Sequence, residues 1–198
     1  MDNIFEYDFN IKRFNREKLI KQKGRVIWIT GLSGSGKSTI ANLLEENLYN
    51  RGYLTYILDG DNIRKTLNSD LGFENNDRAE NIRRVGEVLE ILLNIGVIVI
   101  ATFVSPLEED REKLKTRFGD RFIETYIRCS VKDCETRDPK GIYKRVREGL
   151  IKNFTGVDSP YQVPKSPNIV VDTVNLSPVE SVEIILDYLK RVGDINDY

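Results

Sequence analysis

Residues 31–39 read GLSGSGKST and match the pattern G-x-x-x-x-G-K-[ST]. The glycines of this pattern let the backbone wrap closely around a phosphate, so that N–H groups and a helix N-terminus point at its oxygens. The lysine adds a mobile positive charge, and the next hydroxyl ligates Mg²⁺. A glycine-rich turn needed only for tight packing would explain the glycines but not Lys37 beside Ser38. The predicted triphosphate-binding residues are Gly31, Ser33, Gly34, Ser35, Gly36, Lys37, Ser38 and Thr39, with Ser38 also a metal ligand.

Two carboxylates and an arginine follow the next strand-like run, in the sequence LDGDNIR of residues 58–64. A carboxylate can orient an acceptor hydroxyl, take its proton and help to hold Mg²⁺, while an arginine can pair with a substrate anion. We predict Asp61 as the base or hydroxyl-orienting carboxylate, Asp59 as a residue that supports Mg²⁺, and Arg64 as an anion-binding group. A turn with an aspartate as helix N-cap is the simpler alternative.

Absent residues narrow the chemistry further. The chain contains no histidine, which excludes Ser-His-Asp and Cys-His nucleophilic sites, His-ligated metals and an imidazole base. The guanine-specifying pattern N-K-x-D is also absent, which disfavours a regulatory GTPase. Proton transfer in this chain must therefore use Asp, Glu, Lys, Tyr or water.

Short apolar, β-branched runs alternate along the chain with segments of helical spacing. The predicted strands are residues 25–30, 53–58, 97–104, 122–129 and 169–171. The predicted helices lie around residues 40–48 and 80–94, with further helix starts at 130–133 and 177–180. This alternation predicts an α/β fold in which a parallel sheet of about five strands is covered by helices on both faces. The site should then lie at the carboxyl ends of the strands.

The chain has 198 residues, with 30 basic and 31 acidic side chains and 40% apolar residues, which is an ordinary globular composition. No internal repeat or proline-rich tract divides it, so we predict a single domain over residues 25–198. Residues 1–24 mix aromatic and basic side chains, and we expect an N-terminal extension that is a solvated arm or a packing helix. The balanced charge disfavours a nucleic-acid partner.

Features of the chain that bear on its compartment point to the cytoplasm. Cys129 and Cys134 are the only cysteines, too few for a disulfide framework. The N-terminus is acidic and lacks the basic and apolar regions of a signal peptide. The longest apolar stretch, residues 97–101, is far shorter than the roughly 20 residues of a membrane helix. We expect a cytoplasmic protein without a membrane span.

Further motifs occur in order: DLGF at residues 70–73, R-x-E-N-I-R-R at 78–84, FVSP at 103–106, RDPKG-x-Y at 137–143 and FTG-x-D-x-PY at 154–161. Together with the phosphate loop and LDGDNIR, they resemble the stand-alone adenylylsulfate (APS) kinases from about residue 25 to residue 189. The resemblance implies a three-layer P-loop nucleotide kinase fold. It also implies transfer of the γ-phosphoryl group of ATP to the 3′-hydroxyl of APS, which gives 3′-phosphoadenylyl sulfate (PAPS) and ADP in sulfate assimilation.

By the same resemblance, several side chains should form the APS pocket. Arginines suit the phosphate and sulfate of APS, and aromatic rings offer a face to its adenine. Taken alone, Phe73 is better explained by core packing. The substrate-binding residues implied by the resemblance are Asp61, Arg64, Phe73, Arg78, Asn81, Val104, Ser105, Lys140 and Phe154.

Residues 137–155 carry an excess of basic side chains, and we predict that they form a lid, a name kept below for this segment. Closure over two polyanionic ligands would neutralise charge and exclude water that could otherwise accept the phosphoryl group. Without the motifs, a solvated basic helix would be the better interpretation. The resemblance places Arg137 near the ATP adenine and has Thr173 close that pocket.

Ser105 matches a serine that has been described in this family as a phosphoserine intermediate. Direct in-line transfer needs only an oriented hydroxyl, Mg²⁺ and charge stabilisation, and no histidine is present to activate a serine. We therefore expect Ser105 to hydrogen-bond APS, and the predicted catalytic set is Lys37, Asp61 and Ser105.

The resemblance also implies ATP and Mg²⁺ as co-substrate and cofactor, a homodimer, and APS delivered by a separate ATP sulfurylase. One alternative is a small-molecule kinase of the same scaffold with another acceptor. A second is a nucleotide-responsive binding protein that has lost catalysis, although Lys37, Ser38, Asp61 and Arg64 argue against it.

Overall fold

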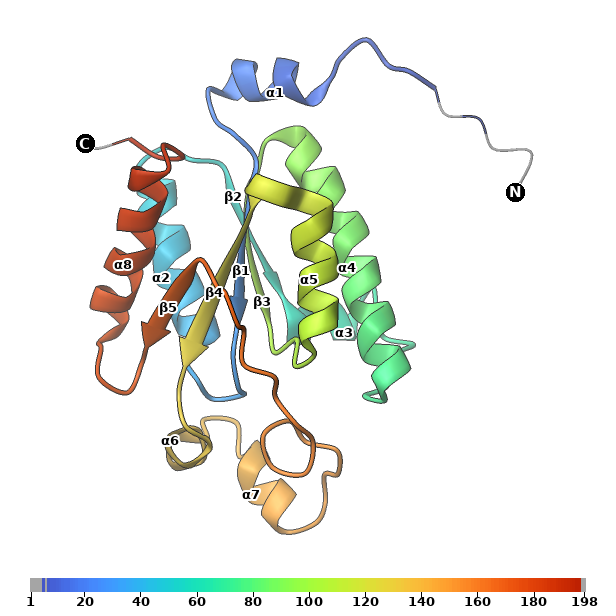
Figure 1. Ribbon diagram of the computed structural model, residues 1–198, viewed down its shortest axis with the longest axis vertical. Helices are drawn as coiled ribbons and strands as arrows, with labels where there is room; N and C mark the ends of the chain where they lie inside the picture. Colours follow the sequence, from blue (N-terminus) through green and yellow to red (C-terminus); the bar gives the residue numbers. More distant parts are fainter. Residues whose placement is uncertain (1–4, 6, 197–198) are drawn as a thin grey trace.

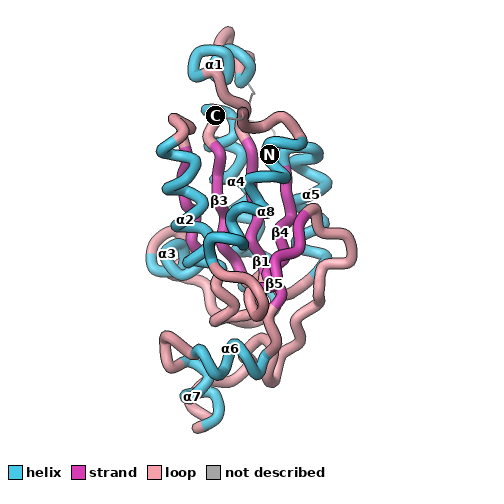
Figure 2. The backbone as a smooth tube through the Cα atoms, turned by 90° about the vertical axis from the view of Figure 1, so that its left-hand side faces the viewer, coloured by secondary structure: helices cyan, strands magenta, loops and turns pink. Residues whose placement is uncertain are grey.

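The computed structural model describes residue 5 and residues 7–196. Its centre is a five-stranded sheet in the order β2-β3-β1-β4-β5, in which every neighbouring pair is parallel (Figures 1 and 2). The strands are β1 (Arg25–Thr30), β2 (Thr55–Asp59), β3 (Ile98–Phe103), β4 (Phe122–Arg128) and β5 (Ile169–Asp172). The predicted α/β fold with a five-stranded parallel sheet is confirmed.

Four long helices cover the two faces of the sheet (Figure 1). They are α2 (Lys37–Asn50) and α8 (Pro178–Arg191) on one face, and α4 (Asn75–Ile95) and α5 (Glu108–Phe118) on the other. Each face has its own apolar core, one centred on Ile27, Ile40 and Ile185, the other on Trp28, Val85 and Leu89. β1 and β3 are buried along their whole length, and apart from Arg25, Thr30 and Thr102 their residues are apolar without alternation, as expected for a sheet covered on both sides.

The central position of β1 fixes where the phosphate loop emerges. Thr30, the last residue of β1, lies opposite Phe103 of β3 and Tyr126 of β4. Beneath that edge, the Trp28 ring stacks on Phe103 with centroids 4.8 Å apart, and Trp28 is fully buried. A buried aromatic side chain of this kind costs about 3–5 kcal/mol when truncated. The loop therefore begins directly above a well-packed part of the core.

Shorter helices lie at the two ends of the sheet. At the carboxyl ends of the strands are α3 (Gly60–Lys65), α6 (Val131–Arg137) and α7 (Ile142–Arg147), whereas α1 (Arg13–Ile20) lies at the opposite end (Figure 1). A 3-10 turn, η1 (Gly119–Arg121), connects α5 to β4. The helix α1 contacts α4, so this part of the predicted extension is a packing helix.

Sequence signals for the ends of helices agree with the structure at α8. Ser177 is its N-cap, and Glu180 completes a capping box with Pro178 in the first turn. The helix α5 was not predicted, because its sequence EEDREKLKTRF offers few apolar residues. No helix among the described residues is long and apolar enough to cross a membrane.

Candidate active site

A cavity of about 610 Å³ opens at the carboxyl ends of the strands. Most of the predicted site residues line it, although they come from segments more than 130 positions apart in the chain. The predicted residues in its lining are Ser33, Gly34, Gly36, Lys37, Ser38, Thr39, Asp59, Asp61, Arg64, Phe73, Arg78, Asn81, Val104, Ser105, Arg137, Lys140 and Thr173. The predicted residues Gly31, Ser35 and Phe154 lie outside that lining.

The phosphate loop has a backbone that only glycine accepts at two of its turns. Gly34 and Gly36 have φ of 76° and 99°, in the left-handed region. A Cβ atom at Gly34 would lie 3.0 Å from the carbonyl oxygen of Cys134. The loop ends at the N-terminus of α2, where no side chain caps the first N–H groups. Those free donors and the helix dipole favour an anion at this place.

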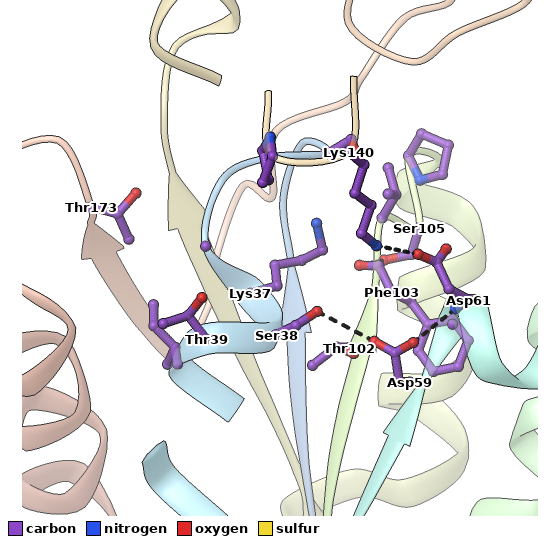
Figure 3. Close-up of a pocket in the computed structure, with 18 of the residues that line it drawn as sticks. Lys37, Ser38, Thr39, Asp59, Asp61, Thr102, Phe103, Ser105, Lys140 and Thr173 are labelled. Atoms are coloured by element: carbon purple, nitrogen blue, oxygen red, sulfur yellow. Dashed lines mark hydrogen bonds and ion pairs between the residues drawn. The ribbon is translucent and has the colours of Figure 1, made fainter. Parts of the chain in front are cut away.

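Lys37 lies in the middle of the cavity, with its side chain lying back along the loop (Figure 3). Its Nζ donates to the carbonyl oxygens of Gly31 at 3.0 Å and Leu32 at 2.8 Å. Removal of water from the ammonium lowers the pKa of Lys37 to about 8, because a charged group is disfavoured where solvent is excluded. An incoming polyphosphate would reverse this effect by favouring the charged form.

Asp59 connects three elements at the edge of the sheet. It caps α3, with Oδ1 accepting from the N–H groups of Asp61 at 3.1 Å and Asn62 at 3.2 Å. Its Oδ2 accepts from Thr102 Oγ1 at 2.8 Å and from Ser38 Oγ at 3.4 Å, as Figure 3 shows for Ser38. Asp59 is therefore the N-cap of α3, as the simpler alternative predicts. Its second oxygen, Oδ2, is not used by the cap and bonds to hydroxyls at the cavity instead.

This pairing of a hydroxyl with a carboxylate fits Mg²⁺, which prefers oxygen ligands and takes few of them from the protein. Ser38 and Asp59 supply those two oxygens from adjacent elements. Among the described residues no cluster of three or more Asp, Glu, Cys or His side chains exists that could hold a metal alone. The remaining ligands of an ion here would have to come from phosphate oxygens and water.

Asp61 and Lys140 meet across the cavity mouth. Lys140 Nζ donates to Asp61 Oδ2 at 2.5 Å, although 79 positions separate them (Figure 3). The side chains are 58% and 65% exposed, so the pair contributes little to stability. The carboxylate raises the pKa of Lys140. The lid thus touches the predicted base directly.

Arginines and one aromatic ring line the cavity at the start of α4. The guanidinium of Arg64 lies 4.5 Å from the centre of the Phe73 ring, and its NH1 donates to Gly72 O at 2.7 Å. Phe73 is 63% exposed, so the core-packing alternative does not hold. Arg78 donates to Phe73 O, Thr155 Oγ1 and Asn153 O. It therefore joins this wall to the lid.

Asn81 is buried behind that wall. Its Oδ1 accepts from Asn68 Nδ2 at 2.9 Å, which leaves the two amide hydrogens of Asn81 for other partners.

Ser105 is held in a strained and buried position. Its φ is 38°, which is uncommon for a residue with a Cβ. Its Oγ accepts from Trp28 Nε1 at 3.1 Å and donates to Thr30 Oγ1 at 2.9 Å. The hydroxyl is therefore occupied by the core beneath the cavity.

Arg111 is a functional candidate that sequence reasoning missed. It is 1% exposed and pairs with Glu124, with Nε to Oε1 at 2.9 Å. Its NH1 donates to Ser105 O at 2.6 Å and its NH2 to Gln162 O at 2.7 Å. It thus fixes the Ser105 backbone and the chain just beyond the lid. Only the charge pattern of α5 could have indicated it, and that pattern also fits a solvated helix.

The root of the lid contacts the phosphate loop. Arg137 donates to Thr173 O at 2.5 Å and to Thr173 Oγ1 at 3.1 Å, and Thr173 Oγ1 donates to Ser35 O at 2.9 Å. Tyr143 OH donates to Ser33 O at 2.9 Å. The Phe154 ring packs edge-on against Tyr143, with centroids 5.0 Å apart. The half-buried Phe154 therefore packs against the buried cluster around Tyr143.

Three comparisons with known proteins agree. Residues 23–172 match the family model described as adenylylsulphate kinase. The adenylyl-sulfate kinases of Clostridium acetobutylicum and Clostridium kluyveri are 56% and 57% identical, over 96% and 94% of this chain and 94% of each relative. A solved structure of the Mycobacterium tuberculosis APS kinase with AMPPNP and APS gives a TM-score of 0.81 at 44% identity, covering 85% of this chain and 99% of that chain.

Proposed function

The chain belongs to the adenylylsulphate kinase family, and we propose from that premise that it transfers the γ-phosphoryl group of ATP to the 3′-hydroxyl of APS, giving PAPS and ADP. The observation that supports it best is one cavity that holds both halves of the chemistry. Lys37 and the phosphate loop line one part, and Asp61, Arg64 and the start of α4 line the other.

The donor half would bind the triphosphate. Backbone N–H groups of the loop and of α2 point at phosphate oxygens, and Lys37 turns from the loop carbonyls to the β- and γ-phosphates. Arg137 and Thr173, which lie together beside Ser35, would border the ATP base. Ser38 and Asp59 would hold Mg²⁺, which when bound neutralises charge on the phosphates.

The acceptor half would orient APS. Asp61 accepts the proton of the 3′-hydroxyl of APS. At the same time the 3′-oxygen bonds to the γ-phosphorus of ATP, and the bond from that phosphorus to the bridging oxygen of the β-phosphate breaks. Lys140 must leave Asp61 first, and it can then pair with an anionic group of APS. Arg64 and Arg78 would bind the phosphate and sulfate, and the exposed Phe73 ring would stack on adenine.

Ser105 would position the acceptor without becoming phosphorylated. Its Oγ is turned toward Trp28 and Thr30, and no carboxylate or lysine of the described residues is hydrogen-bonded to it as a base would be. A hydroxyl in this position can hold the pocket in shape and share a hydrogen bond with APS. Direct transfer from ATP to the 3′-oxygen therefore needs no step at Ser105.

We propose that the lid closes when both substrates are present, and that it excludes water that would compete with the 3′-hydroxyl.

We also propose that APS comes from a separate ATP sulfurylase, and that the protein works as a homodimer in the cytoplasm. Sedimentation analysis of the purified protein would test the dimer.

The experiment that tests the function measures ADP release from MgATP with and without micromolar APS, with the nucleotide products separated. APS-dependent ADP with an equal amount of PAPS is the expected result. ADP release that another small hydroxyl compound stimulates, and APS does not, would assign a different acceptor. ATP binding without turnover of any acceptor would indicate a binding protein.

A further inference from the structure

Asp110 carries a buried carboxylate that the fold leaves without a donor. It lies in the first turn of α5 and lines the cavity, yet it is only 5% exposed. No described residue donates a hydrogen bond to it, and the nearest cation, Lys113 Nζ, is 3.9 Å away on a side chain that is 62% exposed. Loss of solvent raises the pKa of Asp110.

Another buried acid, Glu124, shows how a carboxylate is hydrogen-bonded inside this fold. Glu124 is 2% exposed, and its Oε1 accepts from Arg111 Nε at 2.9 Å. Its second oxygen lies 3.9 Å from Lys115, the same distance that separates Asp110 from Lys113. The two acids therefore differ in the hydrogen bond that Arg111 donates. Buried carboxylates normally accept a hydrogen bond of this kind, because burial removes most of their hydration. Asp110 therefore fits a partner that enters from the cavity.

The packing of two helices shows which part of the cavity Asp110 lines. A Cβ atom at Gly86 of α4 would lie 3.2 Å from Leu114 of α5, and the two helices lie side by side (Figure 1). One turn earlier on each helix are Ile82 and Asp110, and both line the cavity. This end lies on the opposite face of the sheet from α2, whose N-terminus faces the triphosphate.

The chemistry of the acceptor narrows the choice of partner, and this step rests on the proposed function. APS offers three hydrogen-bond donor groups: the two ribose hydroxyls and the amine at C6 of adenine. The 3′-hydroxyl belongs with Asp61, and the 2′-hydroxyl is its neighbour on the ribose. The carboxylate of Asp110 repels the phosphate and sulfate of APS. The adenine ring is therefore the part of APS that can bind at the end of the cavity between α4 and α5.

We propose that Asp110 accepts a hydrogen bond from the C6 amine of the acceptor adenine and makes the acceptor site selective for 6-aminopurine nucleotides. A hydrogen bond to a charged acceptor contributes a factor of about ten to a hundred in binding. Loss of that bond leaves the carboxylate buried and unpaired, which is how polar sites reject analogues that lack one donor.

The test is a cycle of two proteins and two acceptors. The wild type and Asp110→Leu, whose side chain has the same branching at Cγ but no acceptor oxygen, are each assayed for kcat/KM with APS and with its analogue that carries hydrogen at C6. The wild type should lose about ten- to a hundredfold on the analogue. Asp110→Leu should lose a similar factor on APS and then treat both acceptors within about twofold.

Glu109→Gln is the matched control, since Glu109 is in the same helical turn and 79% exposed, and it should keep the wild-type ratio. Asp110→Asn retains one oxygen and tests the inference if the leucine variant does not fold; it should keep only part of the discrimination. Equal losses on the analogue in wild type and Asp110→Leu would overturn the inference, as would a wild type that accepts both equally.

A parallel cycle with 2′-deoxy-APS should show no coupling to Asp110, and coupling there would overturn the assignment to the base. If the wild type forms no PAPS in the presence of APS, the proposed function itself is wrong. That result differs from the failure of the Asp110 inference, in which PAPS forms but the two acceptors are not distinguished.

Discussion

The phosphate loop and the lid line the same cavity, but they are held in different ways. The loop is held by its own backbone, with Lys37 bonded to carbonyls five and six positions away. The lid packs on the loop through the buried Tyr143, but it reaches the acceptor half through polar side-chain contacts, among them Lys140 to Asp61 and Arg78 to Thr155. An exposed ion pair such as that of Lys140 and Asp61 contributes only about 0–1 kcal/mol. The donor half is thus preformed, whereas the acceptor half is completed by contacts that substrates can exchange.

Replacement of Lys37 should have the largest effect, because it removes the positive charge that the phosphate loop itself brings into the cavity. Lys37→Met should lower kcat/KM by about 10²–10³-fold or more, the scale of a lost charge-stabilising group, without lowering the melting temperature. Steady-state kinetics and thermal unfolding check both. Activity near the wild-type level would mean that the backbone of the loop is sufficient.

Asp61→Asn should be next, since it removes the predicted proton acceptor and leaves the donor half intact. We expect kcat to fall by about 10²-fold or more, while the Kd of ATP changes by less than about threefold. Titration calorimetry with a non-hydrolysable ATP analogue measures the second quantity. Lost ATP affinity with turnover spared would show that Asp61 belongs to the donor half.

The depressed pKa of Lys37 predicts a pH dependence of nucleotide binding. Because that pKa is about 8 in the free protein and phosphate favours the charged form, ATP affinity should fall as pH rises through 8. The fall should reach about tenfold by pH 9, and Lys37→Met should lack it. For folding the sign is opposite: between pH 8 and 10.5 the unfolded chain binds more protons, so Lys37 adds stability as pH rises.

Lys140→Ala tests the exchangeable contact of the lid. We expect the KM for APS to rise about fivefold, which is roughly the 1 kcal/mol of an exposed ion pair, with ATP affinity unchanged. Lys144→Ala, at an exposed position of α7, is the control. A similar loss in both variants would show that general positive charge on the lid matters and that no specific contact does.

Ser105→Ala should have the smallest effect. Its hydroxyl is occupied by Trp28 and Thr30, so kcat should fall less than about threefold. Some stability is lost with those bonds, about 1 kcal/mol, as denaturant unfolding would measure. A collapse of kcat to the level of Lys37→Met would contradict the account.

The sequence predicts the loop well because nine consecutive residues contain both its geometry and its chemistry. The place of Asp61 could be predicted in the same way, since it follows a recognisable strand. The helix α5 was not, because its buried face uses Asp110 and Arg111, and a polarity pattern assigns charged residues to solvent. Likewise, no pattern decides whether the Phe154 ring faces the cavity or packs on Tyr143. Those answers depend on contacts across the whole fold.

The central claim is direct transfer between a fixed donor site and an acceptor site that the lid completes, and its most direct test is stereochemical. ATP made chiral at the γ-phosphorus with oxygen isotopes is turned over with APS, and the configuration of the 3′-phosphate in PAPS is determined. A single in-line displacement predicts inversion. Retention would require two displacements, and would contradict the account by placing a phosphorylated residue such as Ser105 on the path.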